Sequence, residues 1–197
     1  MNIEQKPEAK RQEARKHEAR KEESRKEEKT PAERIEVKNA ERKHVYTITV
    51  LTKKYFSYTG FDANRVWERL NSEENNYFVA ELNGYSVGFI DTEVKEGKGR
   101  ILGFAVLDEF QGRGIGKKLL ERALKHLKEK GVSEISLMVF EDNEKAIGLY
   151  EKYGFQSTGR IREIWGKPVI LMKRENSGQK KEKEDEKKEK VDEKKGR

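Results

Sequence analysis

Gln111-Gly112-Arg113-Gly114-Ile115-Gly116 joins an apolar run, residues 101–107, to an amphipathic segment that starts near Lys117. Its glycines therefore stand where a strand pattern passes into a helix pattern. Glycine allows the backbone to turn sharply and to come close to a bound group. The first turn of a helix leaves amide N–H groups without intrahelical partners, and the helix dipole favours negative charge there. The stretch predicts an anion-binding loop at a helix N-terminus.

The segments on either side of this loop predict seven strands and three helices. Runs rich in β-branched and aromatic residues predict strands at 45–51, 77–82, 86–94, 101–107, 134–140, 155–162 and 169–173. Apolar residues at helical spacing predict a short helix from Asp62 to Leu70, a long one from near Lys117 to Gly131, and a third from Asp142 or Asn143 to Gly154.

The turns between these segments indicate how the strands pair. Asn83-Gly84 is a strong hairpin signal, and further turns are expected at 96–99 and 166–168. Antiparallel hairpins come first, and the helix that follows residue 111 then connects two strands in a βαβ crossover, which makes that pair parallel. The sequence therefore predicts an α/β fold with a mixed antiparallel and parallel central sheet flanked by helices.

Charge divides the chain into three parts. Residues 1–43 carry 14 Lys and Arg and 11 Asp and Glu, and residues 174–197 carry 10 and 8. Neither end has an apolar pattern, so we expect a disordered or solvated-helical N-terminal extension, a folded domain over 44–173 and a disordered C-terminal tail. Most of the formal net charge of +7 comes from the two ends, which argues against a basic nucleic-acid groove on the folded part.

Several classes of site are disfavoured by composition. The chain has no cysteine, which excludes disulfides, thiolate nucleophiles and zinc-thiolate sites. Its three histidines, at 17, 44 and 126, are not spaced as metal ligands, so no metal is expected. No apolar stretch suits a signal peptide or a membrane span, and we expect a cytoplasmic protein without a membrane partner.

Two other glycine-rich phosphate loops fit the stretch poorly. A Walker loop needs Ser or Thr after Gly-Lys to hold magnesium, whereas this chain has Gly116-Lys117-Lys118. A dinucleotide-binding fold places Gly-x-Gly-x-x-Gly after its first strand, whereas the glycines here alternate and follow several expected strands.

The pattern that remains is Gln/Arg-x-x-Gly-x-Gly/Ala, which Gln111, Gly114 and Gly116 match. It resembles the coenzyme-A pyrophosphate loop of the GNAT superfamily of N-acetyltransferases. A second stretch resembles another motif of that family, Asn-x-x-Ala-x-x-x-Tyr-x-x-x-Gly-Phe, and is formed by Asn143, Ala146, Tyr150, Gly154 and Phe155. Two motifs in the right order, separated by a helix and a strand, make the resemblance specific, and it covers nearly all of residues 44–173.

The resemblance implies the GNAT acyl-CoA N-acyltransferase fold, with a V-shaped opening between the fourth and fifth strands. The pantetheine arm of acetyl-CoA, the expected cosubstrate, would lie in this opening and pair with main-chain groups near Phe104, Ala105 and Val106. The pyrophosphate would be held by the loop residues Gln111, Gly112, Arg113, Gly114, Ile115, Gly116 and Lys117. Asn143 and Ala146 belong to the second motif, in which the Asn commonly contacts the pantetheine arm.

Tyr150 matches the usual proton donor of the family. A phenol with a pKa near ~10 keeps its proton at neutral pH and can hydrogen-bond a departing thiolate. The structural alternative is a core aromatic residue, because Ala146, Ile147, Tyr150 and Tyr153 form a helical stripe.

The general base is less evident from the sequence. The two positions where relatives carry a Glu correspond to Met138 and Arg100 here. Asp91 and Glu93, or a chain of water molecules, remain as candidates, although such acids are more often merely solvated.

The leading functional hypothesis is an acetyl-CoA-dependent N-acetyltransferase. Its acceptor would be a primary amine: a protein α-amino group, a lysine or a small polyamine-like molecule, with Trp165 as a candidate wall of the acceptor pocket. One alternative is a non-catalytic acyl-CoA-binding regulator, suggested by the missing Glu positions. Another is a module tethered to ribosomes or nucleic acid through the charged ends. The sequence leaves the oligomeric state open, a homodimer included.

Overall fold

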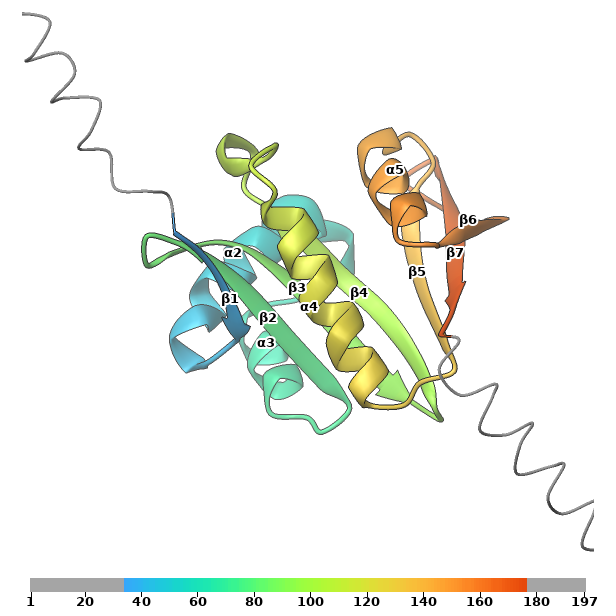
Figure 1. Cartoon of the computed structure of the whole chain (residues 1–197). Coiled ribbons are helices and arrows are strands. Elements are labelled where there is room, and N and C mark those ends of the chain that lie inside the picture. The colour runs from blue at the N-terminus through green and yellow to red at the C-terminus, as the bar shows by residue number, and fades with distance from the viewer. Residues whose placement is uncertain (1–33, 177–197) are drawn as a thin grey trace, which may run out of the picture. The chain divides into compact units, whose positions relative to one another are not determined.

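The computed structural model describes residues 34–176, in which seven strands form one mixed sheet (Figure 1). The strands lie in the order β1-β2-β3-β4-β5-β7-β6. Their bounds are β1 Ile35–Asn39, β2 Asn75–Leu82, β3 Tyr85–Lys95, β4 Lys98–Val106, β5 Glu134–Phe140, β6 Gln156–Ile164 and β7 Lys167–Glu175. The β4–β5 pair is parallel, and the other neighbouring strands in this sheet are antiparallel. The mixed α/β fold expected from the sequence is confirmed.

Helices cover both faces of this sheet. They are α2 Val45–Tyr55, α3 Ala63–Leu70, α4 Ile115–Glu129 and α5 Glu144–Lys152, with short 3-10 helices η1 Arg42–His44, η2 Ser57–Thr59 and η3 Asp108–Phe110. Successive residues of β2 enter different cores: Phe78 lies in the core beneath α4 and α5, whereas Val79 packs with residues of α2 and α3. Successive side chains of a strand point to opposite faces, so the α4/α5 face and the α2/α3 face are two separate layers.

Residues 45–51, expected as the first strand, are helical. Ile48, Thr49, Leu51 and Thr52 are buried, while Tyr46 and Val50 are exposed, and this spacing places one face of α2 on the sheet. The β-branched residues in this segment have strand propensity, but packing of the helix against β3 and β4 overrides it.

The first strand of the sheet is instead β1, which pairs with β2 in antiparallel register. Ile35 and Val37 pack against the α4/α5 core. The sheet therefore begins at Ile35, inside the range 1–43 assigned from the sequence to the N-terminal extension. At the other end, β7 continues to Glu175, inside the range 174–197 assigned from the sequence to the C-terminal tail. The remainder of both ends lies outside the described residues.

The other expected elements are present with small changes at their ends. Asp62 caps α3 by accepting a hydrogen bond from the Arg65 amide at 2.9 Å. The Asn83-Gly84 turn joins β2 to β3, and both residues have positive φ. The last turn lies at Trp165-Gly166, while Lys167 and Pro168 belong to β7.

The opening between the fourth and fifth strands is confirmed. β4 and β5 pair only where residues 99–101 face residues 135–137. Beyond Ile101 and Leu137 the two strands have no ladder between them, although β4 continues to Val106 and β5 to Phe140. In Figure 1 the two strands lie close together at one end and separate toward the other.

None of the helices between residues 34 and 176 has the length and apolar character needed to cross a membrane. In the same range, no three His, Asp or Glu side chains are grouped so that they could hold a metal ion.

Candidate functional site

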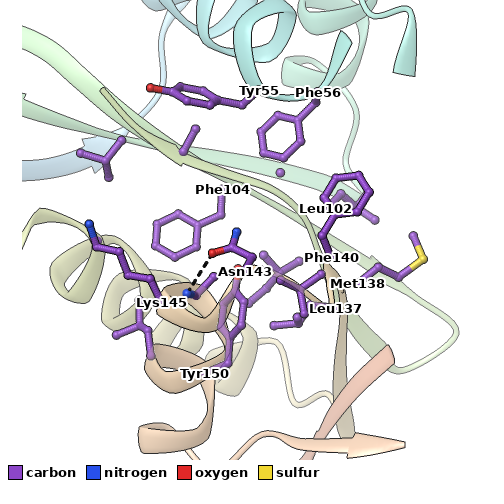
Figure 2. Close-up of a pocket in the computed structure, with 18 of the residues that line it drawn as sticks. Tyr55, Phe56, Leu102, Phe104, Leu137, Met138, Phe140, Asn143, Lys145 and Tyr150 are labelled. Carbon is purple, nitrogen blue, oxygen red and sulfur yellow. Dashed lines mark hydrogen bonds between the residues drawn. The ribbon is translucent and has the colours of Figure 1, made fainter. Parts of the chain in front are cut away.

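A cavity of about 330 Å³ lies where β4 and β5 separate. Its lining comes from both faces of the sheet. On the α4/α5 face it includes Phe104, Asn143 and Tyr150, and on the α2/α3 face it includes Tyr55 and Phe56. Figure 2 shows these two groups facing each other across the strands. The cavity is therefore reached by residues from both layers of the fold.

The glycine loop forms one end of the cavity. Gly112 and Gly114 have φ values of 80° and 78°, a left-handed conformation that other residues adopt only with strain. Gly114 is the N-cap of α4, so the free amides of the first helical turn follow it directly. A Cβ on Gly116 would lie 3.3 Å from Cζ of Phe104, so a larger residue would push against a ring that lines the cavity.

The loop residues named from the sequence do not all reach the cavity. Gln111, Gly112 and Gly116 line it, whereas Arg113, Gly114, Ile115 and Lys117 do not. Ile115 is buried in the core, and the Arg113 guanidinium lies over the Phe110 ring at 5.3 Å. Lys117 lies 3.9 Å from a Glu121 oxygen.

Gln111 connects the end of β4 to α5. Its Nε2 donates to the carbonyl of Val106 and to Oδ1 of Asp108, both at 3.1 Å. Its Oε1 accepts a hydrogen bond of 2.8 Å from Nζ of Lys145. Asp108 also accepts a hydrogen bond of 2.9 Å from the Tyr55 hydroxyl, so the side chains at this end of the cavity form one polar network.

Asn143 and Tyr150 are placed by α5. Asn143 caps the helix through Oδ1, which accepts a hydrogen bond of 3.2 Å from the Ala146 amide. Figure 2 shows this bond as a dashed line, with the amide nitrogen of Asn143 turned toward the side of Phe104. Because Oδ1 is used by the cap, Nδ2 is the group of Asn143 that is left to donate to a ligand.

Tyr150 is 6% exposed and lines the cavity. Its ring centroid lies 6.2 Å from that of Phe104 and 5.8 Å from that of Phe155. Burial raises the pKa of its hydroxyl above the usual value. The hydroxyl makes no hydrogen bond to any residue between 34 and 176. Tyr150 thus combines packing against the core with a proton that stays on the phenol at neutral pH.

The candidate bases Asp91 and Glu93 do not line the cavity. Asp91 is 3% exposed and pairs with Arg69 of α3 at 2.9 Å, and burial raises the pKa of its carboxyl group to about 7. Glu93 lies 3.2 Å from a guanidinium nitrogen of Arg100. Asp91 lies opposite Gly103 of β4, which does line the cavity, but both carboxylates are engaged with cations and neither reaches the lining.

An aromatic cluster borders the cavity on the α2/α3 face, and we call it the aromatic wall. Phe56, Tyr58 and Phe140 line the cavity, whereas Trp165, the candidate named from the sequence, does not line it and packs on Tyr58 from outside. The Tyr58 ring packs edge-on against Phe140, with centroids 5.9 Å apart, and against Trp165, with centroids 5.6 Å apart. The wall therefore joins the segment after α2 to the turn between β6 and β7.

The ionised side chains that line the cavity are both cations. They are Lys145, on the side of the glycine loop, and Arg162, on β6 beside the aromatic wall. The lining, which consists of described residues only, contains no Asp, Glu or His.

This combination of an opened parallel strand pair, a glycine loop and two motif segments defines an acetyltransferase of the GNAT class. The chain belongs to this family: the family model described as "Acetyltransferase (GNAT) family" matches residues 41–155.

Individual relatives agree with the family assignment. An acetyltransferase of Pectobacterium atrosepticum is 37% identical over 102 residues, which cover 52% of this chain and 71% of the relative. An N-alpha-acetyltransferase of Sulfurisphaera tokodaii is 33% identical over 120 residues, which cover 53% and 72%. Among solved structures, the ribosomal-protein-S18-alanine N-acetyltransferase from Escherichia coli has a similar fold, with a TM-score of 0.65 at 22% identity over 72% of this chain and 94% of that chain.

Proposed function

We propose that this acetyltransferase transfers the acetyl group of acetyl-CoA to a primary amine, and that its acceptor is the α-amino group of a peptide or protein. The observation that carries the proposal is a cavity that joins the two faces of the sheet, with the glycine loop on one face and the aromatic wall on the other. Cosubstrate and acceptor can then approach the same point from opposite sides. The curated N-alpha-acetyltransferase of Sulfurisphaera tokodaii supports the choice of acceptor.

The residues on the α4/α5 face suit the cosubstrate. The free amides after Gly114 would hold its pyrophosphate at the positive end of α4. On β4, residues 103–106 pair with β3 along one edge only, so Phe104, Ala105 and Val106 offer main-chain groups along the other edge to the amides of a pantetheine arm. Asn143 would donate to the same arm through Nδ2.

Bound acetyl-CoA would supply an activated acyl group, whose C–S bond is replaced by a C–N bond to the acceptor. The amine loses one proton in this exchange, and the thiolate sulfur gains one. Tyr150 suits the second transfer because its hydroxyl lines the cavity, has no partner between residues 34 and 176, and keeps its proton through burial. We therefore assign it the role of general acid.

Among the described residues that line the cavity, there is no carboxylate or imidazole that could accept the proton of the amine. The aromatic wall disfavours a charged ammonium group, because burial in apolar surroundings stabilises the neutral form of an amine. We infer that an ammonium acceptor loses one proton to water at the mouth of the cavity and reaches the acyl group as a neutral nucleophile. The further proton that its nitrogen releases on forming the C–N bond balances the proton that Tyr150 gives to the thiolate sulfur.

Incubation of the protein with isotopically labelled acetyl-CoA and a mixture of peptides and small amines tests this function, with mass spectrometry and thiol release as the readouts. Labelled acetyl groups on peptide α-amines are the expected result. Tight binding of acetyl-CoA without thiol release over any acceptor would instead favour a non-catalytic acyl-CoA-binding regulator. Label on small polyamines alone would overturn the choice of acceptor.

A further inference from the structure

We propose that Arg162 selects acceptors that carry a carboxylate near the reacting amine, so that peptides with an acidic residue at the second position are preferred over neutral or basic ones. This inference rests on the proposed function, and it adds the residue that would decide which peptides are acetylated.

The position of Arg162 follows from the register of three strands. It lies opposite Val169 of β7, and Val169 lies opposite Phe140 of β5. Residues that are directly opposite in a sheet point to the same face, so Arg162 shares its face with Phe140, whose ring contacts Tyr58. The positive charge of Arg162 lowers the pKa of the Tyr58 hydroxyl, against the larger upward effect of burial. The guanidinium therefore acts on the acceptor side of the cavity.

Two acids that follow β5 are already taken by other cations, and Glu163, the residue after Arg162, lies opposite Pro168 and does not line the cavity. Arg160, two residues earlier on β6, donates two hydrogen bonds of 3.0 Å to Glu141. Lys167, across the hairpin, lies 2.6 Å from a carboxylate oxygen of Asp142. The side chain of Arg162 has no ion pair or hydrogen bond with any residue in the described range 34–176.

A solvated arginine on an edge strand is common, and exposure alone would carry no inference. Arg162 differs from its neighbours because it lines the cavity while Arg160 and Lys167 do not. The second cation of the lining, Lys145, is held by Gln111 on the side of the glycine loop. Among the described residues, the acceptor side of the lining thus presents one guanidinium without a side-chain partner and no acid. A guanidinium binds a carboxylate through two parallel hydrogen bonds, whereas a polyamine would meet a like charge.

The test uses three acceptor peptides that are identical except for Glu, Gln or Lys at the second position. A fourth peptide carries Gln at the second position and Glu at the eighth, which keeps the charge but moves it away from the amine. We expect kcat/KM to be about tenfold higher for the peptide with Glu at the second position than for the one with Gln, as for a charge-assisted hydrogen bond. The peptide with Lys should be the poorest, and moving the Glu to the eighth position should remove the advantage.

Arg162→Gln should abolish the difference between the Glu and Gln peptides, and Arg162→Glu should reverse the order in favour of Lys. Arg160→Gln is the matched control, because it removes the same charge from the same strand, and it should leave the order unchanged. An unaltered Glu-to-Gln ratio in Arg162→Gln, or a preference of the unmodified protein for the Lys peptide, would overturn the inference.

A calorimetric titration separates this inference from the proposed function. With coenzyme A present, the peptide with Glu at the second position should bind about tenfold more tightly than that with Gln, and only in protein that retains Arg162. If that difference is found without acetylation, the proposed reaction fails and the acceptor preference stands. If acetylation proceeds with equal binding of both peptides, the reaction stands and the preference fails.

Discussion

Asp91 accepts two hydrogen bonds from Nη2 of Arg69, at 3.3 and 2.9 Å, and this buried pair fastens α3 to β3. The side chains of the two residues are 4% and 11% exposed. The pair joins the layer of α2 and α3 to the sheet, and it engages the carboxylate that the sequence offered as a catalytic base.

Asp91→Asn should therefore change the pH dependence of stability and spare catalysis. Burial raises the pKa of the Asp91 carboxyl group to about 7, so its ionisation opposes folding, and the unfolding free energy of the unmodified protein should fall as the pH rises from about 4 to about 7. Asp91→Asn cannot ionise and should lessen this fall. Thermal unfolding between pH 4 and pH 8 should show the difference, while kcat/KM, measured well below the unfolding temperature, should stay within about threefold. A general base contributes roughly 10²–10⁴ in rate, and a loss of that size in a folded variant would make Asp91 part of the reaction.

Removal of the Tyr150 hydroxyl should slow the chemical step without loosening the fold. We expect Tyr150→Phe to lower kcat by about 100-fold, in the range of general acid catalysis, and to change KM little. The hydroxyl has no partner between residues 34 and 176, so the unfolding temperature should hold.

Tyr153→Phe on the same helix is the control. Its hydroxyl donates a hydrogen bond of 2.7 Å to Glu121 and does not reach the cavity, so this variant should keep its kcat. Equal rates in the two variants would leave Tyr150 as a packing residue.

A role of the α4 N-terminus in binding coenzyme A can be tested by substituting the glycines at the two ends of this helix. Gly114 and Gly131 flank this helix with φ values of 78° and 68°, so Gly114→Ala and Gly131→Ala should each lose about 1–2 kcal/mol of stability through backbone strain. Only Gly114→Ala should also weaken the binding of coenzyme A, by about tenfold in calorimetry, because its Cβ stands beside the amides that would hold the pyrophosphate. Unchanged affinity in Gly114→Ala would remove the glycine loop from the cosubstrate site.

Glu81 should make the free energy of unfolding fall as the pH is lowered into the acid range. It accepts hydrogen bonds from Lys38 at 2.6 Å and from His44 at 2.9 Å, and the bond from Lys38 is the main reason why the pKa of its carboxyl group lies below the usual 4.5. The native state therefore holds this carboxylate ionised to a lower pH than the unfolded chain does. The stability it contributes is complete above about pH 4.5 and is lost as the pH falls through the native pKa.

Glu81→Gln should accordingly cost about 2 kcal/mol at pH 7 and flatten the fall of the unfolding free energy in acid. Glu68→Gln, which removes an exposed i,i+3 partner of Arg65, should cost less than about 1 kcal/mol and keep the acid slope of the unmodified protein. Denaturant titrations between pH 3 and pH 7 measure both, and equal slopes in the two variants would contradict the role of Glu81.

Most of the fold was predictable because its signals are local. The Asn83-Gly84 turn, the apolar face of α4 and the Asn143 cap each lie within a few residues of the elements they define. The prediction of a strand at 45–51 was wrong because the β-branched residues there have strand propensity. Their burial follows a helical period, which becomes visible only once the segment is packed on the sheet. The strand β1 was missed because Ile35 and Val37 alternate with charged residues inside a strongly charged region.

The same distinction between local and long-range signals applies to the residues of the candidate site. The glycine loop and the α5 residues follow from contiguous motifs, and many of them line the cavity. Arg162 and the aromatic wall come from segments about a hundred residues apart, Phe56 and Tyr58 after α2 and Arg162 on β6. These residues lie close together because of the register across β5, β7 and β6. Short-range sequence patterns do not specify that register.

The contact between Tyr58 and Trp165 joins two surface segments that lie apart from the start of α4, so these segments and the glycine loop can change independently in evolution. Under the proposed function, substitutions in the turn between β6 and β7 or in the segment after α2 would alter which amine is accepted, while the amides at the start of α4 would still bind the acyl donor. Acceptor preference would then evolve, or be engineered, through two short surface segments without change to the donor-binding half of the enzyme.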